Sequence, residues 1–174
     1  MPGVNPLRRH FVEELRQQLS QLAASARRAE EDARESARSM ATESEKKENS
    51  RVMLEYGSLA TAHGKRLRKA QAELQTLDDF IKAGVPDYSA RSPANVGAIV
   101  DVATEDKQGS RERTFILLPV GGATELPGPG GDGFISVITP ASPVGKALMG
   151  KRAGDIIDLE VNGQDCVWEV IEVG

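Results

Sequence analysis

Apolar and small side chains recur at steps of three and four from Leu7 to Arg38, a stretch that contains no Gly and no Pro. Such spacing places these side chains along one face of an α-helix that packs against a second helix. The positions of this stripe are Phe11, Leu15, Leu19, Leu22, Ala26, Ala29, Ala33, Ala37 and Met40. The pattern therefore predicts a long amphipathic helix at the start of the chain.

The same spacing resumes after the polar stretch 42–49, which reads TESEKKEN. The second stripe consists of Tyr56, Leu59 or Ala60, His63, Leu67, Ala70, Leu74, Leu77 and Ile81. We expect this helix to end at Gly84, which can adopt the left-handed conformation of a C-cap, because Pro86 cannot continue a helix.

The two stripes align if the helices fold back on each other. In an antiparallel hairpin the position numbers of opposite residues have a constant sum, and the stripe residues pair with sums of 92 or 93, which places the turn at Lys46 and Lys47. Each arm of about 36 residues would extend roughly 50 Å. His63 is expected to pack against Ala29, because one imidazole without other ligands at suitable spacing is no metal site.

The second half of the chain changes to short runs rich in Val, Ile and Leu, separated by Gly, Pro and Asp. These runs lie at 96–103, 113–120, 133–140, 155–161 and 166–173, and they predict five or six mostly antiparallel strands. One interruption, 142–150, fits a short helix with Ser142 as N-cap, Pro143 at its first position and Gly150 at its end. The class is α+β, with a two-helix antiparallel coiled coil followed by a small antiparallel β domain that carries one short helix.

These patterns divide the chain into a helical hairpin at 1–84 with its tip near 42–49, a linker at 85–94 and a C-terminal domain at 95–174. The hairpin carries 15 basic and 13 acidic residues, whereas residues 85–174 carry 7 and 13. Two halves of opposite net charge are expected to meet different surroundings.

Composition excludes several classes of function. Aromatic residues make up 4% of the chain, too few for an aromatic-lined pocket or a series of base-stacking platforms. The single Cys166 allows no internal disulfide and is expected to be a buried small residue. The C-terminal half has no His to activate a nucleophile. With no apolar run near 20 residues and no signal-peptide core, we expect a soluble, cytoplasmic protein that does not enter membranes.

The segment 134–161, FISVITPASPVGKALMGKRAGDIIDLEV, resembles the C-terminal domain of the bacterial Gre transcription elongation factors. The matching residues are Ile135 and Ser136, the run from Ser142 to Lys151, and Gly154 with Asp155. The resemblance, which extends over the preceding coiled coil, implies an FKBP-like domain that docks on RNA polymerase. The docking residues would be Ser142, Pro143, Gly145 and Lys146. It further implies that a monomer inserts its coiled coil into the secondary channel.

In cleavage-competent members of that family, an Asp and a Glu at the hairpin tip help to hold the second Mg²⁺ of the polymerase. Mg²⁺ prefers hard oxygen ligands, and a second metal stabilises both the attacking and the leaving oxygen. Aligned on the family motif, Glu45 and Glu48 match its two Glu positions, whereas Thr42 replaces the Asp and Lys46 replaces an Asn. Glu43 lies beside the missing acid. We therefore expect a divergent paralog with weak cleavage activity, no cofactor of its own, and at most a shared Mg²⁺ at Glu45.

An alternative is a true stimulator of transcript cleavage that uses Glu45 together with Glu43 or Glu48. In both cases the chain is no enzyme by itself, because the polymerase supplies the catalytic machinery.

A basic band is predicted midway along the hairpin. It consists of Arg27, Arg28, Lys65, Arg66, Arg68 and Lys69. The family carries such a patch toward the nascent RNA, and Lys or Arg contacts to phosphates raise affinity without reading sequence. The competing interpretation is a solvated helical face that Glu30, Glu31 and Asp32 partly neutralise. The sequence leaves both open.

An alternative of another class is a prolyl isomerase with an appended coiled coil. Such a site requires an aromatic-lined pocket, and this half offers only Tyr88, Phe115, Phe134 and Trp168, most of them at strand positions typical of a core.

Overall fold

A computed structural model of the chain describes residues 5–42, 47–106, 109–161 and 164–174. The structure separates into two compact units. One, the distal hairpin, is Gln17–Gln75; the other, the sheet unit, combines Met1–Arg16 with Thr76–Gly174. The base of the helical hairpin thus belongs to the same unit as the sheet, and the boundaries at residues 84 and 95 stay predictions.

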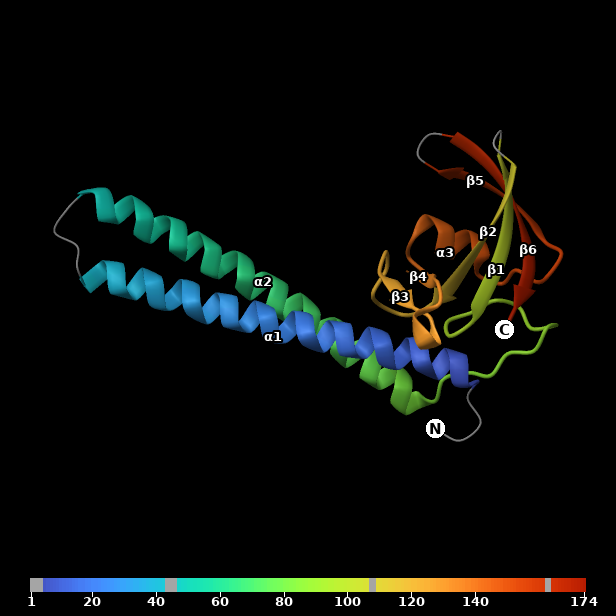
Figure 1. Ribbon diagram of the computed structural model, residues 1–174, viewed down its shortest axis with the longest axis horizontal. Coiled ribbons are helices and arrows are strands. Elements are labelled where there is room, and N and C mark those ends of the chain that lie inside the picture. Colours follow the sequence, from blue (N-terminus) through green and yellow to red (C-terminus); the bar gives the residue numbers. More distant parts are fainter. Residues whose placement is uncertain (1–4, 43–46, 107–108, 162–163) are drawn as a thin grey trace. The chain divides into compact units, whose positions relative to one another are not determined.

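Two long helices, α1 (Pro6–Thr42) and α2 (Lys47–Ala83), form the predicted antiparallel hairpin (Figure 1). Arg16 on α1 forms a salt bridge of 2.6 Å with Asp78 on α2. The position numbers of these two residues sum to 94, close to the predicted 92 or 93. Lys47, expected in the turn, is instead the first residue of α2. Gly84 ends the second helix as predicted, with φ of +93°.

The buried stripe of α1 departs from the prediction at Leu22, which is 50% exposed. From Leu19 onward the stripe runs through half-buried Ala23 to buried Ala26, Glu30 and Ala33. These steps alternate between four and three, an average of 3.5 residues, which is the heptad repeat of two helices packed along a seam, so the buried line runs through Ala23 and passes beside Leu22. The prediction of Leu22 as a seam residue was wrong for this reason.

A six-stranded sheet with one short helix confirms the predicted α+β class. The strands are β1 (Ile99–Asp106), β2 (Gly109–Leu117), β3 (Glu125–Pro127), β4 (Phe134–Ile138), β5 (Ile156–Val161) and β6 (Gln164–Val173). Their order is β3-β4-β2-β1-β6-β5. Within the described ranges the pairings are antiparallel except for β2 with β4, which is parallel.

The helix α3 (Pro143–Leu148) and the 3₁₀ turn η1 (Pro129–Gly131) interrupt the strands. Leu148 of α3 is fully buried and belongs to the same core cluster as Phe115 and Trp168, whose rings stack with centroids 5.6 Å apart. These aromatic residues therefore fill the core beneath the short helix.

The first turns of α1 attach to the remainder of the sheet unit through specific contacts. The buried Arg8 guanidinium donates to the Pro86 carbonyl at 2.6 Å and to the Asp87 carboxylate at 3.3 Å, and it lies 5.1 Å from the centre of the Tyr88 ring. Burial raises the pKa of the Tyr88 hydroxyl. A ring nitrogen of His10 lies 2.9 Å from the Pro127 carbonyl. The linker after α2 is thus fixed to the start of α1 inside this unit.

Candidate functional site

The corner formed by residues 139–146 is held rigidly at the start of α3. The Ser142 hydroxyl accepts a hydrogen bond from the Gly145 N–H at 3.0 Å and donates to the Thr139 carbonyl at 2.8 Å. Pro143 occupies the first helical position, where its missing N–H costs nothing. The predicted N-cap is confirmed. Pro143 and Lys146 are both exposed, so the corner presents a fixed apolar ring and a cation to solvent.

Gly145 has a structural role in this corner. It is buried, and a Cβ at its position would overlap the backbone carbonyl of Thr139 and lie 2.9 Å from the Ser142 hydroxyl. Only a residue without a side chain allows the helix to approach this loop so closely. Gly145 therefore shapes the surface that Pro143 and Lys146 present, and direct contact of Gly145 with a partner stays a prediction.

The far end of α3 is joined to the linker, a contact that sequence reasoning missed. Ala94 is buried, its N–H donates to the Lys151 carbonyl at 2.7 Å, and its carbonyl accepts from the Gly150 N–H at 2.7 Å. The Arg152 guanidinium also donates to the Arg91 carbonyl. No local pattern could reveal these bonds, since they join segments more than 50 residues apart.

The predicted tip acids lie at or beyond the limit of the described residues. Glu43 and Glu45 fall in the segment 43–46, which is outside the described ranges. Glu48 lies in the first turn of α2, but the position of its side chain is not described. Within the described ranges no group of three His, Cys, Asp or Glu side chains is placed to hold a metal ion. The shared Mg²⁺ at Glu45 thus stays a prediction.

Below the tip, the two helices leave a hollow of about 350 Å³. Its lining is Asp32, Glu35, Ser36, Ser39, Met40 and Tyr56. Met40 and Tyr56 were predicted to be seam residues, and both are only half-buried.

The six residues of the predicted basic band are all exposed. Two carboxylates on the hairpin interact with or approach this band. Lys69 lies 3.9 Å from Glu73 one turn along α2, and the end of the Arg68 guanidinium lies beside Gly64 near the carboxylate of Glu30. In the described part of the hairpin, Arg27, Arg28, Lys65 and Arg66 have no carboxylate within 4.0 Å.

Glu30 on α1 and Gly64 on α2 face each other at the same height along the hairpin. Glu30 is nearly buried, its carboxylate pairs with Arg34 at 2.6 Å, and it occupies the space that a side chain on Gly64 would need. At about 1.5 Å per residue, Arg27 and Arg28 on one helix and Lys65 and Arg66 on the other lie within one turn of this level. The basic residues are therefore gathered at one height along the hairpin, although Glu30 itself turns away from solvent.

The aromatic residues offered for a prolyl isomerase site do not line a common pocket. Phe115 and Trp168 are buried in the core, Tyr88 covers Arg8 and donates from its hydroxyl to the Val96 carbonyl at 2.8 Å, and Phe134 is exposed. This arrangement of the four aromatic residues argues against the isomerase alternative.

His63, predicted as a seam residue, is half-buried on α2.

Comparison with known proteins places this geometry in a family. The family model described as "Transcription elongation factor, GreA/GreB, C-term" matches residues 92–174. A transcription elongation factor GreA from Rhodospirillum rubrum is 35% identical over 119 residues, which cover 66% of this chain and 69% of that protein. The chain belongs to the GreA/GreB family.

Two further relatives of this GreA/GreB family member share less of its sequence. The GreA of Lachnoclostridium phytofermentans is 28% identical over 109 residues, and the match spans 62% of that protein's length and 61% of this chain. Among solved structures, the GreA factor homolog 1 (Gfh1) protein of Thermus thermophilus is 20% identical, with 95% of both chains covered and a TM-score of 0.36.

The residues matched by the family model, 92–174, contain all six strands and the short helix α3. No helix in the described ranges combines the length and apolar character that crossing a membrane requires.

Proposed function

We propose that this family member binds bacterial RNA polymerase through its C-terminal domain, inserts the helical hairpin into the secondary channel and modulates elongation, with weak transcript cleavage. The observation that carries the proposal is the rigid corner at Ser142–Lys146, because it presents the family's signature residues on a preformed surface. A preformed surface binds with little loss of conformational entropy. The partner is RNA polymerase, and the chain would act as a monomer in the cytoplasm.

The weak cleavage follows from the residues of the tip. Thr42 stands where cleavage-competent members carry an acid, and Lys46 and Lys47 add positive charge where a cation would be held. Glu45 and Glu48 keep two acidic positions, which supports the alternative of a genuine cleavage stimulator. In either case the Mg²⁺ belongs to the polymerase active centre, and this chain would contribute carboxylate ligands only.

A cleavage assay separates these two functions. Stalled, backtracked elongation complexes are incubated with Mg²⁺ and the chain, and the release of short 3′ RNA fragments is timed. We expect slow release with the natural chain and faster release with Thr42→Asp. Glu31→Ala, which makes the same chemical change as Glu45→Ala at an exposed position on α1, should leave the rate of release unchanged. Fast release that Glu45→Ala abolishes would establish the cleavage stimulator instead.

A binding assay tests the docking corner. Association of a labelled chain with core RNA polymerase is compared for Lys146→Glu and for Arg113→Glu, a charge reversal at an exposed position on β2 of the same domain. Only the first should weaken binding. Equal loss in both variants would indicate a general electrostatic effect and reject the corner as the docking surface.

The basic band is proposed to contact nascent RNA. If so, replacing Arg27 and Arg28 by Ala should lower the affinity for an RNA-containing complex and reduce its salt dependence, while affinity for core polymerase without RNA stays the same. An equal loss with and without RNA would show that the band binds the protein lining of the channel.

A further inference from the structure

The strand β5 (Ile156–Val161) lies at one end of the sheet order. In the described part of the chain it pairs with β6 on one side, and no strand pairs with its other side. A free edge of this kind presents a row of backbone N–H and C=O groups that can accept an additional strand.

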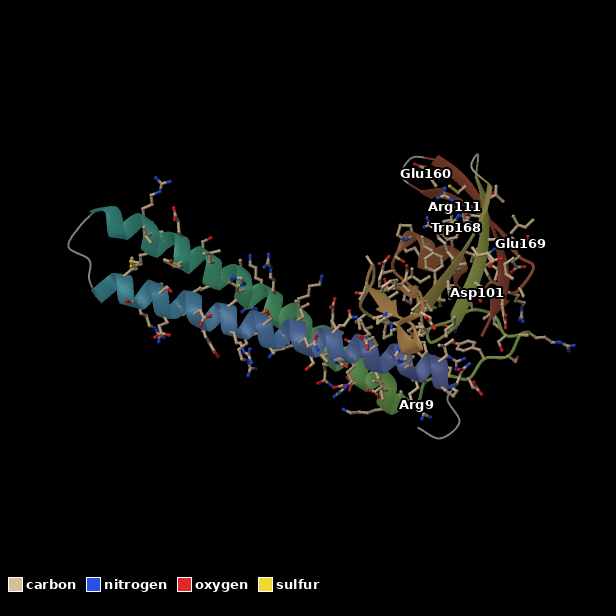
Figure 2. The ribbon with its side chains drawn as sticks, viewed as in Figure 1. Arg9, Asp101, Arg111, Glu160, Trp168 and Glu169 are labelled. Carbon is tan, nitrogen blue, oxygen red and sulfur yellow. The ribbon has the colours of Figure 1, made fainter. Side chains whose placement is uncertain are left out.

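The register of β5 with β6 determines which side chains accompany this edge. Ile156 lies opposite Glu169, and Asp158 lies opposite Val167, so these four residues share one face of the sheet. Ile157 lies opposite Trp168, and both are buried on the other face. In Figure 2, the neighbours Trp168 and Glu169 point to opposite sides of the sheet.

The solvent face beside the edge combines apolar and acidic side chains. Ile156, which is 66% exposed, lies opposite Glu169, and on β6 Val167 (52% exposed) and Ile171 (46% exposed) lie two residues before and two residues after Glu169. One exposed apolar residue is ordinary, but three adjacent ones on a sheet face mark a contact surface. Asp158 continues this surface along β5.

The charge of this region has one sign. Residues 153–174 contain six Asp or Glu and no Lys or Arg. Asp158 and Glu160 are exposed, alternate along the strand and thus lie on the same face as Ile156. On this face, the side chains of an approaching strand would therefore lie opposite the apolar Ile156 and then opposite the carboxylates of Asp158 and Glu160.

The charges on β5 also disfavour pairing with the β5 strand of a second copy of the chain. Pairing of two β5 strands would bring Asp158 and Glu160 of both copies close together, and like charges on facing strands are destabilising. A hollow of about 370 Å³ beside the paired strands β5 and β6, lined by Asp158, Leu159, Glu160, Cys166 and Val167, offers space for a side chain of a different partner.

We propose that β5 is a docking edge for an extended segment of a partner protein that alternates basic and apolar side chains and adds to the sheet as a seventh strand. The backbone of the segment pairs with the free edge of β5. Its basic side chains lie opposite Asp158 and Glu160, and an apolar side chain covers Ile156. This surface shares no residue with the corner at Ser142–Lys146, although α3 and β5 are neighbours in the fold, and it does not depend on polymerase binding.

The test uses a capped, fluorescent Lys-Val-Lys-Thr-Val peptide and the full chain. We expect saturable binding by fluorescence anisotropy, weakened at least tenfold by the double substitution Asp158→Lys with Glu160→Lys. Glu112→Lys, an acid of the same sheet on β2, should leave the affinity unchanged. A Glu-Val-Glu-Thr-Val peptide should show the reverse preference and bind the double variant.

Hydrogen exchange distinguishes strand addition from simple charge attraction. Bound peptide should slow exchange of backbone N–H groups in β5, and N-methylation of the peptide backbone should remove both the protection and the binding. The proposal is overturned if the peptide does not bind, if Glu112→Lys weakens binding as much as the double variant, or if exchange in β5 does not change. The double variant should still bind core polymerase, so failure here leaves the proposed function untouched.

Discussion

Two glycines in α2 allow the packing of the hairpin to be measured. Gly57 is exposed, and nothing lies within 4 Å of the position that a Cβ would occupy. At Gly64, in the same helix, a Cβ would lie 2.8 Å from the Oε1 atom of Glu30 on α1. Replacing each by Ala applies the same chemical change to an open site and to an occupied one.

The expected magnitudes follow from these surroundings. In an exposed helix interior, Ala is favoured over Gly by about 0.8–1.0 kcal/mol, and Gly57→Ala should gain this amount in full. Gly64→Ala has the same intrinsic gain, but the Glu30 carboxylate must move and loosen its ion pair with Arg34. Such a pair contributes roughly 0.3–0.5 kcal/mol, so the net gain at Gly64 should be smaller by at least that amount.

Urea unfolding followed by far-UV circular dichroism provides the measurement. Gly57→Ala should raise the midpoint with an unchanged slope, and Gly64→Ala should raise it clearly less. In a Glu30→Ala background the obstruction is gone, and Gly64→Ala should recover the gain seen at Gly57, which gives a favourable coupling in a double-mutant cycle. Equal gains at both glycines in the natural background would refute the placement of Glu30 over Gly64.

Three further predictions concern the sheet unit. Leu15→Ala should lower the free energy of unfolding by about 2–5 kcal/mol, because Leu15 is fully buried and packs against Gly121; a loss below about 1 kcal/mol would contradict this contact. Ser142→Ala should cost about 1 kcal/mol through loss of the helix cap, measured by thermal unfolding, and no loss would reject the cap. The hydrogen bond from Arg16 lowers the pKa of Asp78, so this pair stabilises the fold above the ordinary pKa of an Asp, and the contribution disappears as pH falls through the lowered value. The stability difference between the natural chain and Asp78→Asn should therefore shrink as pH falls below the ordinary pKa of an Asp and also shrink in high salt, and a difference that stays constant as the pH is lowered would disprove it.

The helices could be predicted from the sequence because their signals are local. Steps of three and four define the stripes, and Gly84 with Pro86 defines an end, so both helices and their antiparallel pairing followed directly. The position of Leu22 could not be predicted, since it depends on how the contact line drifts along two particular helices. The buried Glu30 was missed for a related reason, because only the absence of a side chain on Gly64 makes room for it.

The corner at α3 was predictable for the same reason as the helices. Ser, Pro and Gly at fixed spacing describe a capped turn, and the structure contains that turn. The long-range bonds of Ala94 and the parallel pairing of β2 with β4 join distant segments, and no local pattern encodes them. The same holds for Arg8, whose burial depends on the path of the linker after α2.

We propose that this chain binds RNA polymerase and brings its hairpin tip to the active centre. The most direct measurement places a photo-crosslinking residue at Asn49, beside the tip, and irradiates the chain with a backtracked elongation complex. We predict crosslinks to the 3′ end of the RNA or to polymerase residues around the catalytic Mg²⁺, and their loss with Lys146→Glu. Crosslinks confined to the outer surface of the polymerase, or no association with the complex, would contradict the account.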